Sequence, residues 1–181
     1  MTTAAANTDF SLLPSGFLAN SFTDIPSIGW SPDSKWVALR ADHDTNGQYD
    51  LFLIRWSAPG TAERPYTALG TGGVSTWSFA PNAQAVAFVG TIGTETAPGL
   101  HLATLPASGA LSAALLSVAD AATQTDVTWL PGSRVILYRA GASKTQLLSV
   151  AIDSNGAAAT LLPVSGASKT AVVSYQIDPP R

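Results

Sequence analysis

The stretch Trp30-Ser31-Pro32-Asp33-Ser34-Lys35-Trp36-Val37-Ala38-Leu39 decides the fold, because its pattern returns twice along the chain. An aromatic residue, a proline turn and an apolar strand follow one another again in residues 79–88 and 129–138. The leading aromatic residues lie 49 and 50 residues apart, and a shorter copy begins at Ile177, 48 residues further on. Self-similarity at a constant period of this length is typical of repeat architectures.

Each repeat contains four short runs of strand-forming residues separated by turn residues. The predicted strands are 26–30, 36–41, 49–56 and 64–69 in the first repeat, 74–79, 85–91, 100–105 and 114–118 in the second, and 126–129, 134–139, 146–152 and 158–164 in the third. Residues 70–73 predict a turn between repeats, and Asn155-Gly156 predicts a hairpin turn in the third repeat. Residues 107–124 favour a helix by local propensity, but the repeat register predicts a strand within them.

Four-stranded units of 40–50 residues are typical of β-propeller blades. The residues from Trp30 to Ala38, together with the run Asp50-Leu51-Phe52-Leu53-Ile54, resemble the TolB-type propeller repeat, a WD-repeat-like family. The resemblance covers residues 26–181 and is strongest in the first repeat. The fold class we expect is therefore all-β, an incomplete β-propeller of about three four-stranded blades plus flanking single strands.

The expected domain organisation is a flexible tail at residues 1–9 followed by a propeller arc over residues 10–181. Its blades are predicted at 26–70, 74–119 and 126–165, with partial strands at 10–18 and 171–178. The first of these partial strands is expected because residues 11–16 echo residues 160–166. An arc of three blades leaves two open flanks, and such flanks favour association. We therefore expect another protein, or a second copy of the chain, to cover them.

Composition excludes several classes of function. The 181 residues carry nine basic and twelve acidic side chains, a net charge of −3 that provides no electrostatic basis for binding nucleic acid. The absence of cysteine excludes disulfides, a thiol nucleophile and a cysteine zinc site. The uncharged stretch between Arg64 and Glu95 is interrupted by glycines and a proline, so we expect no membrane span.

One motif has the spacing of a calcium-binding loop. Asp42, Asp44 and Asn46 stand at alternate positions before Gly47, as in calcium loops that place oxygen ligands on a tight turn. Leu53 stands where an EF-hand would carry its bidentate glutamate, so the motif is not an EF-hand. The predicted ligands of this calcium ion are the side chains of Asp42, Asp44, Asn46 and Asp50 and the backbone carbonyl of Gln48. The alternative is a solvated loop between two strands.

The chain shows no catalytic motif, so we expect no enzyme activity. Its five tryptophans follow strand positions, which favours core packing over a sugar platform. The expected function is a non-catalytic scaffold or accessory subunit that mediates protein assembly. Two alternatives remain open: the propeller portion of a larger hydrolase resembling prolyl-oligopeptidase-type peptidases, and a carbohydrate or peptide receptor. The family resemblance implies a periplasmic or extracellular location, although residues 1–9 lack the pattern of a secretory signal.

Overall fold

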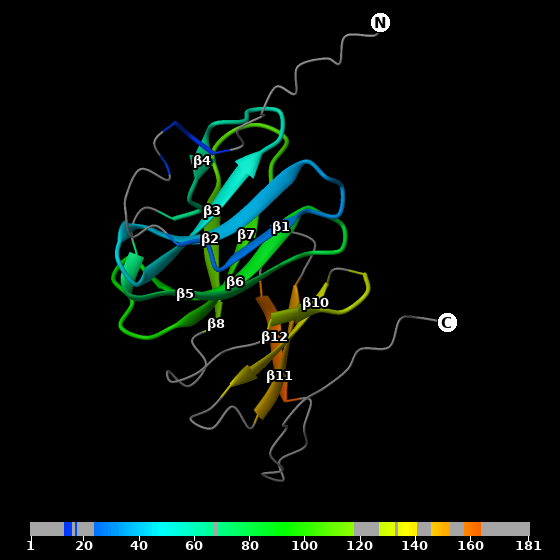
Figure 1. Ribbon diagram of the computed structural model, residues 1–181. Coiled ribbons are helices and arrows are strands. Elements are labelled where there is room, and N and C mark those ends of the chain that lie inside the picture. Colours follow the sequence, from blue (N-terminus) through cyan, green and yellow to red (C-terminus); the bar gives the residue numbers. More distant parts are fainter. Residues whose placement is uncertain are drawn as a thin grey trace, which may run out of the picture.

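The computed structural model describes residues 13–15, 17, 24–66, 69–117, 127–132, 134–140, 146–152 and 158–163. These residues form an all-β structure without a helix, so none of their elements is a helix that could cross a membrane. Their strands make three four-stranded antiparallel sheets, each built from consecutive strands, and none of the sheets closes on itself (Figure 1).

The three sheets follow one another along the chain. Sheet 1 contains β1 (Ser27–Trp30), β2 (Trp36–Thr45), β3 (Gln48–Arg55) and β4 (Ala62–Glu63). Sheet 2 contains β5 (Leu69–Phe79), β6 (Ala85–Ile92), β7 (Gly99–Thr104) and β8 (Ser112–Ser117). Sheet 3 contains β9 (Val127–Trp129), β10 (Val135–Ala140), β11 (Gln146–Ile152) and β12 (Ala158–Pro163).

Three sets of four strands were predicted, and this prediction is confirmed. The strand predicted within residues 107–124 is also confirmed, because β8 occupies residues 112–117 despite the helical propensity of the stretch. Tertiary context overrides a weak local preference here. The strands β11 and β12 pair as a hairpin would, but the Asn155-Gly156 turn lies outside the described residues.

Three local predictions were wrong. The fourth strand of the first repeat is β4 at residues 62–63, not a strand at 64–69. Residues 70–73 lie within β5 instead of forming a turn; Gly73, at φ +62°, packs so closely on the Tyr49 backbone that a Cβ would lie 3.0 Å from it. Residues 13–15 and 17 form a turn and not the partial strand predicted at 10–18. The partial strand predicted at 171–178 lies outside the described residues.

The connection between the first and second strands has the same geometry in all three sheets. In each sheet, the residue after the leading aromatic donates its backbone N–H to the carbonyl of the first residue of the second strand. These bonds are Ser31 to Trp36, Ala80 to Ala85 and Leu130 to Val135, each 2.9 Å long. The leading aromatic then pairs with a residue seven positions on in every sheet: Trp30 with Val37, Phe79 with Val86 and Trp129 with Ile136.

The side chain after the repeat proline stabilises this turn in the same way in sheets 1 and 2. Asp33 Oδ1 accepts the N–H of Lys35 at 3.2 Å, and Asn82 Oδ1 accepts the N–H of Gln84 at 3.0 Å. Because an amide oxygen accepts this bond as a carboxylate does, the Asp-to-Asn change between repeats preserves the turn.

Apolar side chains between the sheets form the core. Sheets 1 and 2 pack around Trp36, Ala38, Leu51, Leu53, Val74, Val86, Phe88, Ala103 and Leu105, with Trp77 and Phe79 partly buried at the same interface. Sheets 2 and 3 pack around Ala80, Ala87, Val89, Leu100, Leu102, Val127, Trp129 and Ile136. An indole crosses each interface: Trp77 Nε1 donates to Ser27 Oγ, and Trp129 Nε1 donates to the carbonyl of Ser78, both at 3.0 Å.

The prediction that all five tryptophans pack in the core was wrong for two of them. Trp36 and Trp129 are buried and Trp77 is partly buried, but Trp30 is 49% exposed and Trp56 is 46% exposed. The rings of Trp30 and Trp56 lie 5.4 Å apart, so the two exposed side chains contact each other on the surface of sheet 1.

Candidate functional site

The predicted calcium loop is the hairpin between β2 and β3. Its turn is Asn46-Gly47, where Gly47 adopts a φ of +78° that an L-amino acid rarely tolerates. The strand register shifts between Ala41 and Thr45, so the backbone bulges over the residues that carry the first two predicted ligands. A bulge redirects side chains that a regular strand would place on one face.

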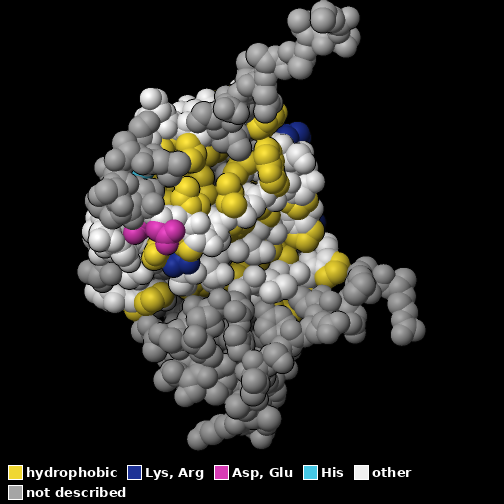
Figure 2. All heavy atoms as spheres, viewed as in Figure 1, with side chains coloured by type: hydrophobic (Ala, Val, Ile, Leu, Met, Phe, Trp, Pro, Cys, Tyr) yellow, Lys and Arg dark blue, Asp and Glu magenta, His cyan; other side chains and the backbone are white. Residues whose placement is uncertain are grey.

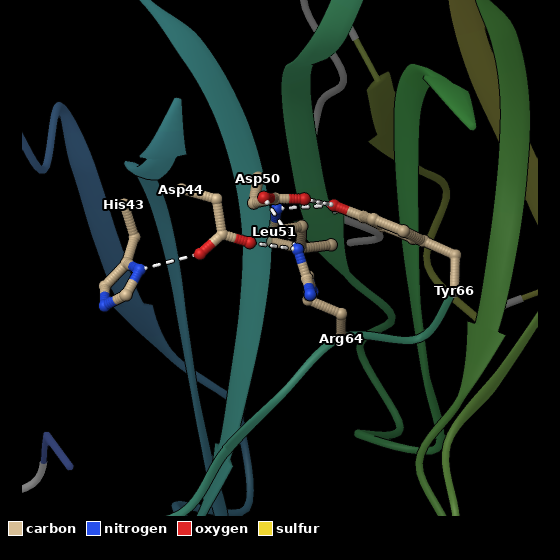
Figure 3. Close-up of polar contacts among 6 residues, drawn as sticks. All are labelled: His43, Asp44, Asp50, Leu51, Arg64 and Tyr66. Carbon is tan, nitrogen blue, oxygen red and sulfur yellow. Dashed lines mark hydrogen bonds and ion pairs between the residues drawn. The ribbon is translucent and has the colours of Figure 1, made fainter. Parts of the chain in front are cut away.

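Arg64 brings two of the predicted ligands together. Its Nη1 lies 2.6 Å from Asp44 Oδ2 and 3.1 Å from Asp50 Oδ2, so one guanidinium bridges both carboxylates (Figure 3). His43 Nδ1 lies 2.8 Å from Asp44 Oδ1 on the opposite side. The hydrogen bond from His43, followed by the charge of Arg64, lowers the pKa of the Asp44 carboxyl below its ordinary value.

Asp50 is buried and has a second partner on the side away from Asp44. Tyr66 donates its hydroxyl to Asp50 Oδ1 at 2.9 Å and accepts the N–H of Leu51 at 2.8 Å (Figure 3). Burial raises the pKa of Asp50, although Tyr66 and Arg64 oppose the shift. Burial, followed by the Asp50 charge, also raises the pKa of Tyr66, so the phenol remains protonated and serves as a hydrogen-bond donor.

Asp42 faces a different set of partners. Its Oδ1 accepts the backbone N–H of Asp24 at 2.5 Å, and its Oδ2 accepts the N–H of Gly47 at 3.2 Å. The carbonyl of Asp24 accepts the N–H of Asp42 in return, at 3.3 Å. The bond from Asp24, together with that from Gly47, lowers the pKa of Asp42. Asp42 therefore closes the hairpin turn and connects it to the chain ahead of β1.

Of the remaining two predicted ligands, one lies in the turn and the other directly follows it. Asn46 is exposed, and Gln48 is half-buried at the start of β3, where it pairs with Thr45. The structure thus brings Asp44 and Asp50 together around Arg64 but directs Asp42 elsewhere. Among the described residues, no three His, Asp or Glu side chains form a group that could hold a metal ion.

The basic and aromatic partners of this site were not predicted from the sequence. Arg64 is the only lysine or arginine between residues 56 and 133, which was a signal that the neighbouring carboxylates would share it. Tyr66 gave no such signal, because its contact with Asp50 depends on the path of the chain after β4. Arg64 lines two pockets, one of about 550 Å³ beside Tyr66 and Glu95 and one of about 400 Å³ beside His43 and Phe17.

A second polar pair, also missed, lies in sheet 2. His101 is fully buried, stacks on Phe88 with ring centroids 5.0 Å apart, and has its Nε2 2.9 Å from Glu95 Oε1. Glu95 Oε2 accepts the N–H of Ile92 at 2.9 Å, so the pair fastens the loop between β6 and β7.

A surface patch on sheet 1 stands apart from the hairpin. It consists of Ile28, Trp30 and Trp56, which are the exposed large hydrophobic side chains of the described residues. We call this patch the open flank. Ile28 pairs with Leu39 and Trp30 with Val37, so the patch continues an apolar face of sheet 1. Hydrophobic side chains are visible on the surface of the molecule over β1–β3 (Figure 2).

No family model matches the chain, and no curated protein is similar enough to it to count as a relative.

Proposed function

We propose that this chain is an arc of a TolB-type β-propeller that serves as a non-catalytic scaffold, assembling with other β-sheets through its open flank. The consecutive strand order of the three sheets and their shared turn geometry support the propeller architecture. The packing of sheet 2 between the other two sheets supports it further, since propeller blades stack face to face.

The observation that carries the proposed function is a match between exposed and buried positions. One repeat period separates Ile28, Trp30 and Trp56 from Trp77, Phe79 and Leu105. The last three all pack at the interface between sheets 1 and 2. Every large hydrophobic residue on the open flank therefore occupies a position that the repeat uses for packing one sheet against the preceding one. The open flank is an interface of the same kind without its partner sheet.

We propose that the partner is a second copy of the chain, presenting its sheet 3. At the two interior interfaces, the sheet that receives the following sheet does so on a face that includes Ala38 in sheet 1 and Ala87 in sheet 2. Leu137 occupies the same register position in sheet 3, because each of the three pairs with the residue before the leading aromatic. Two copies that each offer both surfaces would close a ring of six sheets.

Light scattering after size exclusion tests this function. We expect the wild type to approach twice the chain mass of 18.6 kDa as its concentration rises. A Trp30→Ser/Trp56→Ser variant should remain at 18.6 kDa, because tryptophans contribute heavily to binding at interface centres. Gln84→Ser, at an exposed position on a turn of sheet 2, is the matched control and should behave as the wild type. A wild type that stays monomeric at every concentration contradicts the proposal.

Calcium binding at the β2–β3 hairpin is a second candidate function. The spacing of its oxygen-bearing residues, the 46% exposure of the Asp44 side chain and the sharp turn at Gly47 favour it. A calcium ion between Asp44 and Asp50 would have to replace Arg64, which already neutralises both carboxylates. Calorimetric titration should therefore give tighter calcium binding for Arg64→Gln than for the wild type. The absence of heat in both, at millimolar calcium, would exclude the site.

A further inference from the structure

Residues ahead of β1 cover part of the same face of sheet 1 that carries the open flank. Leu13, Phe17 and Ile25, which we call the N-terminal cap, pack over a cluster of side chains from β2 and β3. The covered side chains are Val37, Leu39, Ala41, Phe52 and Ile54.

The cap occupies the place of a neighbouring sheet. One repeat period separates Val37, Leu39 and Ile54 from Val86, Phe88 and Ala103 of sheet 2, which pack against sheet 1. The cap thus covers this face of sheet 1 as sheet 1 covers the corresponding face of sheet 2. It leaves the β1 side of the face, with Ile28 and Trp30, exposed.

Apolar and aromatic side chains hold the described part of the cap on sheet 1. Phe17 is buried, with its ring centroid 4.3 Å from that of His43 and 5.0 Å from that of Phe52. Leu13 and Phe17 belong to a turn, closed by a 3.0 Å bond from the Phe17 N–H to the Pro14 carbonyl, and the described residues ahead of β1 add no strand to sheet 1. Behind the cap, the reciprocal backbone bonds between Asp24 and Asp42 anchor the chain to the hairpin.

We propose that the N-terminal cap is an autoinhibitory segment, which occupies the covered part of the docking face and is displaced when the sheet of a second copy docks. This inference rests on the proposed function, since it assigns a regulation to the same face. A segment whose described residues pack on the sheet through side chains and add no strand to it opens locally at a lower cost than the unfolding of that sheet. If the Asp24–Asp42 bonds persist, Ile25 stays in place and the displaced part of the cap is the part that contains Leu13 and Phe17.

Single cysteines can measure this opening, because the chain contains no cysteine of its own. Val37→Cys places a thiol under the cap, and Val86→Cys places one at the matching position under sheet 1; both valines are buried. We expect a thiol reagent to modify residue 37 at least roughly tenfold faster than residue 86, because local opening exposes only the former. Adding Phe17→Ala should accelerate modification at residue 37 and leave residue 86 unchanged. Equal modification rates at both positions, with the same dependence on urea as global unfolding, would overturn the proposal that the cap opens locally.

The competition between cap and partner is tested separately by light scattering. If the wild type self-associates through the open flank, Phe17→Ala should shift the transition to lower protein concentration by several-fold. An unchanged transition would show that the cap does not compete. If no variant associates, the proposed function fails on its own, while the thiol rates at residues 37 and 86 still decide whether the cap opens.

Discussion

Sheets 1 and 2 present the same face of the same repeat, yet the two faces differ in what covers them. In sheet 2, Trp77, Phe79 and Leu105 pack against sheet 1. In sheet 1 the corresponding residues are exposed, Ile28 at 63%, Trp30 at 49% and Trp56 at 46%. The difference teaches that the same repeat positions are packed in sheet 2 and exposed in sheet 1, and the proposed function interprets the exposed positions as an interface for a partner sheet.

The largest effect that separates the two faces is expected at their centres. Phe88→Ala should destabilise the protein by about 3–5 kcal/mol, because the cavity forms between two packed sheets. Leu39→Ala, one period earlier, should cost about 2–3 kcal/mol, since the N-terminal cap can move into the space. Urea unfolding of both variants measures the difference. An equal or larger loss at Leu39 would contradict the contrast between the faces.

The next effect concerns the rim of the two faces. Leu105→Ala should cost about 2–3 kcal/mol, because Leu105 is buried against sheet 1. Trp56→Ala should cost about 1 kcal/mol or less in the monomer, since half of the larger side chain is already in water. Thermal unfolding at low protein concentration compares the two. A greater cost at Trp56 would mean that its ring stabilises sheet 1 itself and is not reserved for a partner.

The fit between the two sheets depends on a glycine. A Cβ at Gly29 would lie 2.8 Å from Cη2 of Trp77, so Gly29→Ala should cost about 1–3 kcal/mol through overpacking. Phenylalanine lacks the far ring atoms of tryptophan, so Trp77→Phe should relieve most of this cost. A double-mutant cycle measured by urea unfolding checks the coupling. Strictly additive costs would show that the two residues do not contact each other in solution.

The smallest effect distinguishes the repeat turns. A hydrogen bond from Ser31, with that from the Lys35 backbone, lowers the pKa of Asp33 below 3.8. The ionised Asp33 therefore stabilises the fold above about pH 4, and this stabilisation is lost as the pH falls through the lowered pKa of Asp33. Asp33→Asn, which installs the residue of the second repeat, should cost roughly 0.5 kcal/mol or less at pH 7 and nothing near pH 2. Unfolding at the two pH values tests this, and a cost that does not vary with pH would exclude an ionic contribution.

The sequence predicted the sheets well because their signals are local. Turn residues and alternating apolar positions recur at each period, so the strand positions follow from the pattern around Trp30, Phe79 and Trp129. The two-residue strand β4 and the glycine-rich start of β5 were missed, because tertiary packing and not local propensity determines them. The predicted fold class was right at the level of an all-β chain with three four-stranded sheets.

The candidate site was less predictable, for physical reasons. Spacing alone identified Asp42, Asp44 and Asp50, but a bulge in β2 separates Asp42 from the other two. The position of Arg64 depends on the path of the chain after β4, which no local pattern specifies. The pattern around Trp30 and Trp56 matches that of the packed residues one repeat later, because burial depends on a neighbouring sheet and not on the local sequence.

Residue 28 reports directly whether the open flank becomes buried in an assembly. In an Ile28→Cys variant the only thiol lies on the flank, and its rate of modification reports whether a partner covers it. We expect this rate to fall several-fold as protein concentration rises, while the rate of an Ala107→Cys control on an exposed loop of sheet 2 stays constant. A rate at residue 28 that does not change with concentration would show that no second copy covers the open flank.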